Sequence, residues 1–278
     1  MWPVKVLMAH PAEFQVSYSI NPYMKDEAGN LNQVDVPKAI KQWEALRDLF
    51  THLGMAVQVL DAVPGLPDMV FTANQSFPFV NAEGRPSLLM SRMKSPFRQP
   101  EVEHFRTWAM KNKIQTYELK TSGNFEGMGD ALWDYEAQEI FGGFGPRTSV
   151  EVYDQIRELT GKPVHLLKLV DERFYHLDTC LCLLGNSIAF AVREAFDEEG
   201  WSFLRTHFQT LKEIPLKEAL ENFAGNMLAL GRQQIVMQSG AHQTKANLEK
   251  LGYQIHEVET SEFMKSGGSV FCMKLLYF

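Results

Sequence analysis

The sequence predicts a single α/β domain, residues 1–278, built from five similar modules arranged as a ring. Three observations support this prediction. An amphipathic helix followed by a turn and a strand recurs five times, at intervals of about 50 residues. Further short apolar segments accompany these units, and no Pro-, Gly- or Ser-rich linker divides the chain. The recurrence indicates pseudo-five-fold symmetry.

The elements are predicted in chain order from apolar periodicity and turn residues. Residues 1–8 have the character of a first strand. Ile40, Trp43 and Leu46 share one helical stripe that ends before Gly54, and the next strand begins at residue 55. Four later helix–strand pairs are predicted at 105–110 with 114–119, 152–159 with 164–169, 201–211 with a segment near 214, and 248–251 with 253–258. Additional strands are predicted at 139–143, 187–192 and 232–237.

Two other architectures produce a similar spacing of helices and strands along the sequence. An open solenoid stacks helical repeats, but the extra strands favour small mixed modules in a ring. An ordinary α/β sheet also joins helices to strands at such intervals. The glycine-rich segments 123–129 and 142–145 lack the spacing and strand context of a dinucleotide-binding loop, which argues against a nucleotide-binding sheet.

Composition limits the classes of function. No apolar run is long enough to cross a bilayer, so we expect no membrane association. The net charge is −7 and basic residues do not cluster, which argues against nucleic acid as a partner. The same charge is compatible with a small cationic substrate. Only three cysteines occur, and the first residues do not resemble a secretory leader. We therefore predict a cytoplasmic protein without disulfides.

Cys272 is the candidate nucleophile. It follows the glycine pair Gly267-Gly268 and lies in a short apolar segment predicted as a strand. In a reducing compartment a single cysteine is more often a small buried hydrophobe than a catalyst. Its role therefore depends on the residues around it.

Two further segments carry acids and an imidazole. Glu126 and Asp130 are bracketed by glycines, which let backbone approach a ligand, although acids in such turns also cap backbone amides. Residues 174–182 are predicted as one strand, which puts His176 and Asp178 on the same face. The sequence thus predicts an acid–base pair beside a second acidic cluster.

Cys180 and Cys182 would share that strand face and raise the question of a metal site. A straight strand spreads four such ligands over roughly 20 Å, too far for one tetrahedral ion. We predict that both cysteines are buried apolar residues, that the candidate site contains no metal and that no organic cofactor is needed. Calcium or zinc at the surface stays an open alternative.

Two polar loops complete the set of candidate residues. One spans residues 67–74 and carries Asp68, Phe71 and Asn74, and the other contains Asn21. Each loop alone is consistent with an ordinary turn. Together with a thiol, an imidazole and carboxylates, they supply the groups needed for nucleophilic attack on an electron-poor carbon.

Taken in register, these segments resemble the guanidine-modifying (pentein) superfamily, which includes arginine deiminases, glycine amidinotransferases, dimethylarginine dimethylaminohydrolases and arginine dihydrolases. The matching segments cover nearly the whole chain: Asn21-Pro22, Pro67-Asp68-x-x-Phe71-Thr72-x-Asn74, Phe125-Glu126-Gly-x-Gly129-Asp130, Gly145-x-Arg147-Thr-Ser149, Phe174-Tyr-His176-Leu-Asp178-Thr179 and Gly267-Gly268-x-x-x-Cys272. The resemblance implies a five-bladed αβ propeller with the active site in its central channel.

The sequence is most similar to the arginine dihydrolases, which convert arginine to ornithine, ammonia and carbon dioxide. Deiminases carry an aspartate at the position of Asn74, whereas dihydrolases carry asparagine, as this chain does. An amide binds without a negative charge and both donates and accepts hydrogen bonds. It is therefore suited to hold a neutral ureido intermediate for a second attack.

The resemblance also implies roles for individual residues. Cys272 attacks the guanidinium carbon, His176 acts as acid and base, and Glu126 and Asp178 clamp the guanidinium. Arg92 and Arg147 are candidates for binding the substrate carboxylate, and Arg98 is an alternative to Arg92. Asp68, Asn21 and Phe71 line the pocket. Asp130 either joins the site or supports the loop that holds Glu126.

Several alternatives stay open at the level of sequence. Dimethylarginine hydrolysis, arginine deimination and amidine transfer would use the same thiol, imidazole and acids. A catalytically silent binding module on the same scaffold is the non-enzymatic alternative, although such a module would not need the thiol. The expected partner is a small guanidino compound, arginine or a methylated arginine, and a homo-oligomer is compatible with the sequence.

Overall fold

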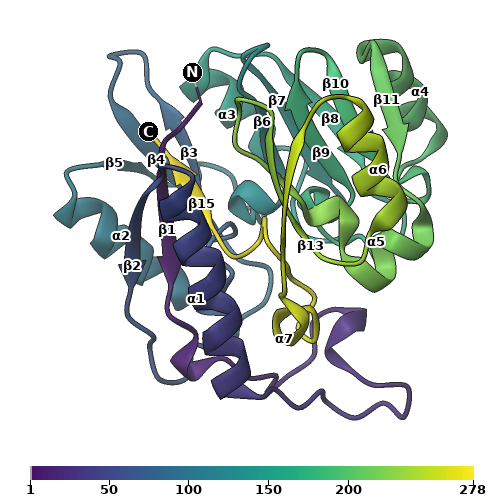
Figure 1. Ribbon diagram of the computed structural model, residues 1–278. Coiled ribbons are helices and arrows are strands. Elements are labelled where there is room, and N and C mark those ends of the chain that lie inside the picture. The colour runs from purple at the N-terminus through teal and green to yellow at the C-terminus, as the bar shows by residue number, and fades with distance from the viewer. Residues whose placement is uncertain (1) are drawn as a thin grey trace.

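The computed structural model describes residues 2–278 and contains five three-stranded sheets (Figure 1). The first sheet has the strand order β15-β1-β2, from Leu275–Tyr277, Lys5–Ala9 and Ala56–Leu60. Its middle strand, β1, pairs antiparallel with β15 and parallel with β2. This sheet therefore joins the two ends of the chain.

The other four sheets repeat the same plan within consecutive stretches of chain. In each, two strands form an antiparallel hairpin and a third strand pairs in parallel with the second. Their strands are β3 Ser76–Val80, β4 Pro86–Met90 and β5 Gln115–Tyr117; β6 Ala131–Asp134, β7 Glu139–Phe144 and β8 Val164–Lys168; β9 Leu181–Gly185, β10 Ile188–Ala191 and β11 Thr210–Glu213; β12 Leu228–Ala229, β13 Gln234–Gln238 and β14 Gln254–Val258.

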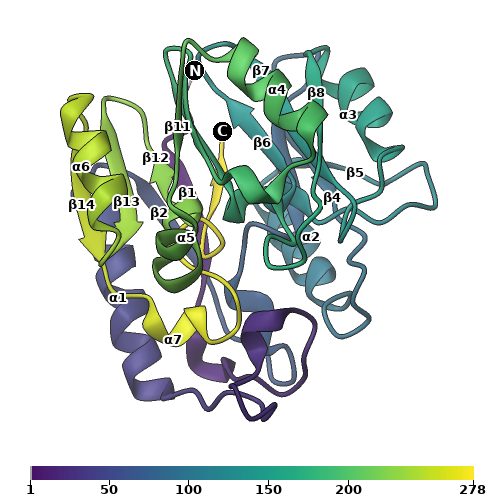
Figure 2. The same ribbon diagram turned by 90° about the vertical axis from the view of Figure 1, so that its right-hand side faces the viewer.

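A helix supplies the crossover that a parallel pair requires in every module. These helices are α1 Val36–His52, α2 Glu101–Lys111, α3 Val152–Thr160, α4 Glu198–His207 and α6 His242–Lys250. Two further helices, α5 Leu216–Asn222 and α7 Ser261–Met264, lie between modules in the sequence. Figure 2 shows α3 and α6 at opposite sides of the molecule, with the strands between them.

A short 3-10 turn precedes the first strand of four modules. These turns are η3 Pro67–Val70, η4 Gly127–Gly129, η5 Leu177–Thr179 and η7 Ala224–Asn226. Turn η5 contacts both η4 and η7, so segments about 50 residues apart in sequence meet in space. The repeated turn thus gathers equivalent positions of successive modules at one place.

The predicted helix–strand pairs are confirmed, with shifted boundaries. The helix expected over 201–211 ends at His207 because Phe208 is extended, and Thr210 already belongs to β11. Gly54 and Gly161 end helical segments in the left-handed region, with φ of +84° and +63°. The sequence did not predict the 3-10 turns or the hairpin strands β3, β4, β6, β9 and β12.

Two predicted strands are wrong. Residues 174–182 do not form one strand, because Asp130 accepts a hydrogen bond from the backbone N–H of Leu177 and the amide of Cys180 bonds back to Leu177. These contacts fold Leu177–Thr179 into η5, and a strand starts only at Leu181. Cys272 lies in a turn before β15 rather than in a strand.

The interior is apolar, and large aromatic side chains in it are fully buried, including Trp43, Phe77, Phe125, Phe141 and Phe190. Cys180 and Cys182 are buried as predicted, and both thiols point to backbone carbonyls. Within residues 2–278 no helix combines the length and the apolar character needed to span a bilayer.

Candidate active site

The turns that precede the first strands bring the predicted polar residues together around a small cavity. The cavity measures about 20 Å³ in the ligand-free chain, which is room for roughly one water molecule. Among the predicted residues, those that line it are Asn21, Asp68, Phe71, Asn74, Arg98, which is the predicted alternative to Arg92, Arg147, His176 and Cys272. A wider outer cavity of about 490 Å³ shares Asn21, Arg147 and Tyr175 with it and opens toward solvent.

Cys272 is 3% exposed and its thiol lies 3.2 Å from Oδ2 of Asp178. The side-chain amide of Asn226 donates to the same sulfur at 3.2 Å. Burial and the negative charge of Asp178 raise the pKa of the Cys272 thiol well above its ordinary value, and the bond from Asn226 opposes this. The thiol of this candidate nucleophile therefore lies between a hydrogen-bond donor, Asn226, and an acceptor, Asp178.

Asn226 is a site residue that the sequence analysis missed. Its Oδ1 accepts the backbone N–H groups of Ser269 and Cys272, at 3.1 and 3.3 Å, and its Nδ2 donates to the backbone carbonyl of Asp178 at 2.9 Å. This one side chain ties the nucleophile's turn to η5. It is the last residue of η7, whereas Glu126 and His176 directly precede η4 and η5, so the spacing of 50 residues between the three does not mark equivalent positions.

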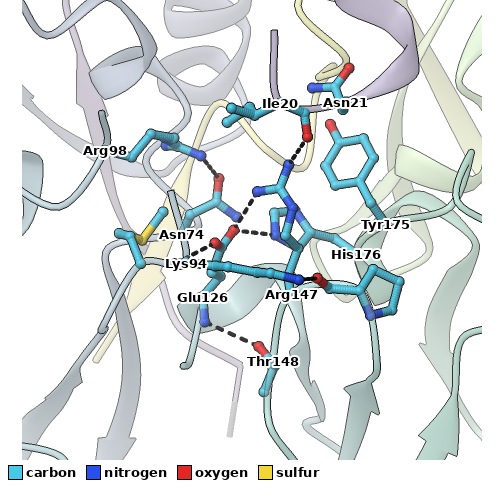
Figure 3. Close-up of polar contacts among 12 residues, drawn as sticks. Ile20, Asn21, Asn74, Lys94, Arg98, Glu126, Arg147, Thr148, Tyr175 and His176 are labelled. Carbon is cyan, nitrogen blue, oxygen red and sulfur yellow. Dashed lines mark hydrogen bonds and ion pairs between the residues drawn. The ribbon is translucent and has the colours of Figure 1, made fainter. Parts of the chain in front are cut away.

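His176 and Glu126 form a buried pair, with Nε2 and Oε2 2.6 Å apart (Figure 3). Glu126 is fully buried, and Arg147 Nη1 donates to the same Oε2 at 3.0 Å. Burial would raise the pKa of Glu126, but the charge of Arg147 and the bond to His176 lower it below the usual range. The backbone N–H of Lys94 binds the other oxygen at 3.0 Å. Glu126 is thus an anion that orients the imidazole.

Arg147 bridges the two cavities. Its Nη2 donates to the carbonyl of Ile20 at 2.6 Å, and its guanidinium carbon lies 4.9 Å from the centre of the Tyr175 ring (Figure 3). A guanidinium of the chain itself therefore forms an ion pair with the carboxylate of Glu126. Tyr175, which the sequence analysis did not select, is anchored through its hydroxyl to the carbonyl of Gly267.

Asp178 is fully buried, and within residues 2–278 its Oδ1 has no hydrogen-bond partner. Burial raises the pKa of Asp178 to about 7, while the bond from Cys272 and the charge of Lys274 lower it. Lys274 is itself buried, which lowers its pKa to about 7, and its Nζ lies 3.1 Å from the centre of the Phe271 ring. A buried oxygen without a partner calls for a ligand or a proton.

Asn74 is held by Arg98, whose Nη1 donates to Oδ1 of Asn74 at 2.9 Å (Figure 3). Arg98 is only 4% exposed and is paired with Glu101 at 3.0 Å, so its guanidinium is fixed. Because arginine only donates hydrogen bonds, this contact assigns the amide orientation. The Nδ2 donor of Asn74 is buried and, within the described chain, has no acceptor.

Three further predicted residues line the cavity through fixed contacts. Asp68 accepts hydrogen bonds from the hydroxyls of Tyr18 and Ser266, at 2.6 and 3.1 Å. Asn21 donates to the carbonyl of Ser266 at 2.9 Å. The ring of Phe71 packs directly against Gly268, where a Cβ atom would overlap it. These contacts explain the need for glycine before the nucleophile.

Four predicted residues do not line the cavity: Glu126 and Asp178, which contact the lining residues His176 and Cys272, and also Asp130 and Arg92. Asp130 accepts the Thr148 hydroxyl at 2.6 Å and the Leu177 amide at 3.1 Å, so it supports the loops that carry Glu126 and His176. Burial raises the pKa of Asp130 to about 6. Arg92 donates to the carbonyls of Thr121 and Gly123, away from the cavity.

Comparison with known proteins shows the family to which the chain belongs. The family model described as N,N dimethylarginine dimethylhydrolase, eukaryotic, matches residues 10–277. The chain belongs to this family. Among curated members, the N(G),N(G)-dimethylarginine dimethylaminohydrolase of Mycobacterium tuberculosis is 32% identical over 268 residues, which cover 96% of this chain and 84% of the relative.

The chain is also similar to proteins whose names give two activities. The bifunctional arginine dihydrolase/ornithine cyclodeaminase ArgZ of Synechocystis sp. is 33% identical over 273 residues, 98% of this chain but 37% of the relative. The chain thus spans little more than a third of that relative. The crystal structure of the N-terminal domain of ArgZ bound to substrate superposes with a TM-score of 0.90 at 31% identity, covering 98% of this chain and 97% of that domain.

Proposed function

We propose that this protein is an arginine dihydrolase, which hydrolyses the guanidinium C–N bonds of arginine to give ornithine, ammonia and carbon dioxide. Similarity to the N-terminal domain of ArgZ over 98% of the chain supports the choice of substrate. The buried thiol, imidazole and carboxylates support a hydrolase with a covalent intermediate. The observation that carries the proposal is the fixed orientation of Asn74.

Arg98 decides what Asn74 offers to a substrate. Since Oδ1 is bound to Arg98, only the Nδ2 donor is free for a ligand. This donor can form a hydrogen bond with the carbonyl oxygen of a neutral ureido group. It cannot form one with a guanidinium, which has only donors. With aspartate at this position, Arg98 would hold one oxygen and the other would accept from a guanidinium. The amide therefore favours retention of the ureido intermediate.

Binding of arginine requires Arg147 to move. The inner cavity holds roughly one water molecule, whereas a guanidinium group needs the space that the side chain of Arg147 occupies. The substrate guanidinium would replace Arg147 at Glu126 and reach the free Oδ1 of Asp178. The displaced Arg147 would then be free to bind the substrate carboxylate, as the sequence analysis predicts.

The first hydrolysis begins when the positive charge of the substrate stabilises the thiolate form of Cys272. The thiol proton is transferred to Asp178 or to solvent. The sulfur bonds to the guanidinium carbon, and one C–N bond breaks as His176 protonates the departing ammonia. His176 then deprotonates a water molecule. The hydroxide bonds to the carbon, the C–S bond breaks, and the thiol is regenerated beside a ureido group.

The second hydrolysis repeats these steps on the ureido carbon. Donation from Asn74 Nδ2 would stabilise the negative charge that develops on the ureido oxygen. Loss of the second ammonia leaves a thiocarbamate on Cys272, and water converts it to the carbamate of ornithine. The carbamate releases carbon dioxide, so each arginine consumes two waters and gives two ammonia molecules.

We further propose that the five modules close into a propeller. The pairing of β15 with β1 supports closure, because it joins the last strand of the chain to the first module. The turns η3, η4, η5 and η7 would then face a common channel that contains the site. A cytoplasmic location and a homo-oligomeric state stay predictions.

Counting products tests the proposed activity. The purified protein should release two ammonia molecules per ornithine from arginine, with little free citrulline. One ammonia with citrulline would indicate a deiminase, dimethylamine from dimethylarginine would indicate the other activity of the family, and no product would favour a binding module. Cys272→Ser should fold normally and lose turnover, and wild-type rates in this variant would rule out the nucleophile.

A further inference from the structure

Glu139, His165 and His207 form a cluster outside the candidate active site. Glu139 is the first residue of β7, His165 lies on the neighbouring strand β8, and His207 is the last residue of α4. The Nε2 atoms of both histidines approach Oε2 of Glu139, at 3.0 and 3.1 Å. We propose that these three side chains bind a divalent transition-metal ion, with zinc as the preferred ion.

The spacing of the ligand atoms fits one ion. Zinc binds imidazole nitrogen and carboxylate oxygen at about 2.0–2.2 Å, so neighbouring ligands of a tetrahedral site lie about 3.3 Å apart. Both nitrogen–oxygen distances are already within a few tenths of an ångström of this value. All three ligand atoms lie within 4.8 Å of one another, so rotations of the side chains can bring them to the spacing that an ion requires.

The geometry suits an ion as well as the hydrogen bond that joins His165 Nε2 to Glu139 Oε2 at 3.0 Å. Two imidazoles that merely share a carboxylate could each bind a different oxygen, but His165 and His207 converge on the same one. Each of the three side chains is about a quarter exposed, at 24% or 25%. A fourth, solvent ligand therefore has access, which completes the tetrahedral set that zinc prefers.

Aromatic packing holds the two imidazoles in place. The ring centre of Phe141 lies 5.1 Å from that of His165 and 5.4 Å from that of His207. Phe203 packs against the same two rings, at 5.1 and 5.0 Å. The site is thus organised before an ion arrives, which reduces the entropy lost on binding.

The proposed role is structural. The ion would tie the C-terminal end of α4 to two strands of the β6–β7–β8 sheet, and α4 leads directly into β11 of the next sheet. Binding would therefore link two modules. The ligands are distinct from Cys272, His176 and the other residues of the candidate active site.

The test measures zinc binding in the Cys272→Ser background, which removes the thiol as a competing ligand. Isothermal titration calorimetry should give one zinc per chain, and saturating zinc should raise Tm by several degrees. Co²⁺ in place of zinc should give the visible absorption of a four-coordinate complex. Glu139→Gln and His207→Gln keep polar side chains of similar size and should each weaken zinc binding at least tenfold.

His256→Gln is the matched control. His256 is also partly exposed on a strand and contacts Gln234, but no carboxylate accompanies it. Its replacement should leave zinc affinity and the Co²⁺ spectrum unchanged. Absence of saturable zinc binding by the parent, or unchanged affinity in both Glu139→Gln and His207→Gln, would leave only a hydrogen-bonded cluster and overturn the proposal.

Discussion

At the scale of single residues, Asn74 separates the proposed dihydrolase from a deiminase. Asn74→Asp should shift the product from ornithine toward citrulline, because the oxygen not bound to Arg98 would accept from the guanidinium and repel the ureido oxygen. The ratio of the two products, measured by amino-acid analysis, reports the change. Asn30→Asp makes the same chemical change at an exposed turn and should keep the parent ratio. An unchanged ratio in Asn74→Asp would contradict the assigned role.

Asn226 is expected to position the nucleophile. Asn226→Ala removes the donor to Cys272 Sγ and the acceptor for two backbone amides. We expect kcat to fall roughly 10²–10³-fold, as when one preorganised donor is lost from an active site. The pH at which iodoacetamide alkylates Cys272 should also rise, because the Asn226 bond lowers the pKa of the thiol. A purely structural role would lower stability without moving that alkylation profile.

Asp178 should destabilise the protein at neutral pH. Its pKa is about 7 in the folded chain and 3.8 when unfolded, so the folded state binds more protons between these values and loses stability as pH rises through them. Asp178→Asn removes this titration. The difference in free energy of unfolding, variant minus parent, should increase by up to about 1.4 kcal/mol for each pH unit between pH 4 and 7. Denaturant titrations at several pH values would detect the trend, and parallel pH profiles would contradict it.

At the scale of elements, the contact between η5 and η7 depends on Gly225. A Cβ atom on this residue would overlap the carbonyl of Thr179 and lie 2.8 Å from its carbon, and backbone atoms cannot turn aside. Gly225→Ala should therefore separate the turns, lower stability by about 1–3 kcal/mol and displace Asn226 from Cys272. Gly200→Ala in α4 is the control, since its nearest contact would be 3.2 Å from a side-chain atom. Full activity in Gly225→Ala would show that the turns tolerate separation.

The elements also explain what could be predicted from sequence. Amphipathic helices such as Val36–His52 repeat every 3.6 residues and end at glycine, so local pattern identifies them. The 3-10 turns do not have such a pattern, because they form through contacts with distant residues. Leu177–Thr179 is an example, since the Asp130 bond that shapes it crosses 47 residues. Residue types and family motifs therefore select Cys272, His176 and Glu126 as candidates, whereas Asn226, and the contact of Arg98 with Asn74, emerge only from the structure.

The sequence predictions for the candidate site differ from the structure where a local geometry had to be assumed. His176 and Asp178 are predicted to share a strand face. In the structure they flank and belong to a 3-10 turn, and they contact different partners: His176 binds Glu126 and Asp178 binds Cys272. Arg92 was expected to face the substrate, but its guanidinium is bound to backbone carbonyls. Charge and residue type do not reveal which arginine is free to move.

At the scale of the whole molecule, the pairing of β15 with β1 should stabilise the fold by holding the last strand against the first. Leu276 is 1% exposed and lies opposite Val6 in this pair. Leu276→Ala should cost about 2–5 kcal/mol of stability, as is usual for truncation of a buried leucine. Because Cys272 lies just before this strand, turnover should fall as well. Thermal unfolding followed by circular dichroism measures the loss of stability. A loss below about 1 kcal/mol would argue against a stabilising role for the β15–β1 pair.

A circular permutant tests closure more directly. Lys5 lies opposite Tyr277, and Lys5 Nζ contacts the carbonyl of Phe278 at 3.1 Å, so a short flexible linker can join the two ends. New ends can be opened in the turn after Val80, between β3 and β4, where Glu83 and Gly84 are exposed. If the modules form a closed ring, covalent order is unimportant, and the permutant should fold with the same circular dichroism and keep kcat within about tenfold. Cutting the same turn without joining the ends is the control for the break itself. A permutant that unfolds while the cut chain stays folded would mean that β1 and β15 must remain free at their ends, and closure through this pair would be wrong.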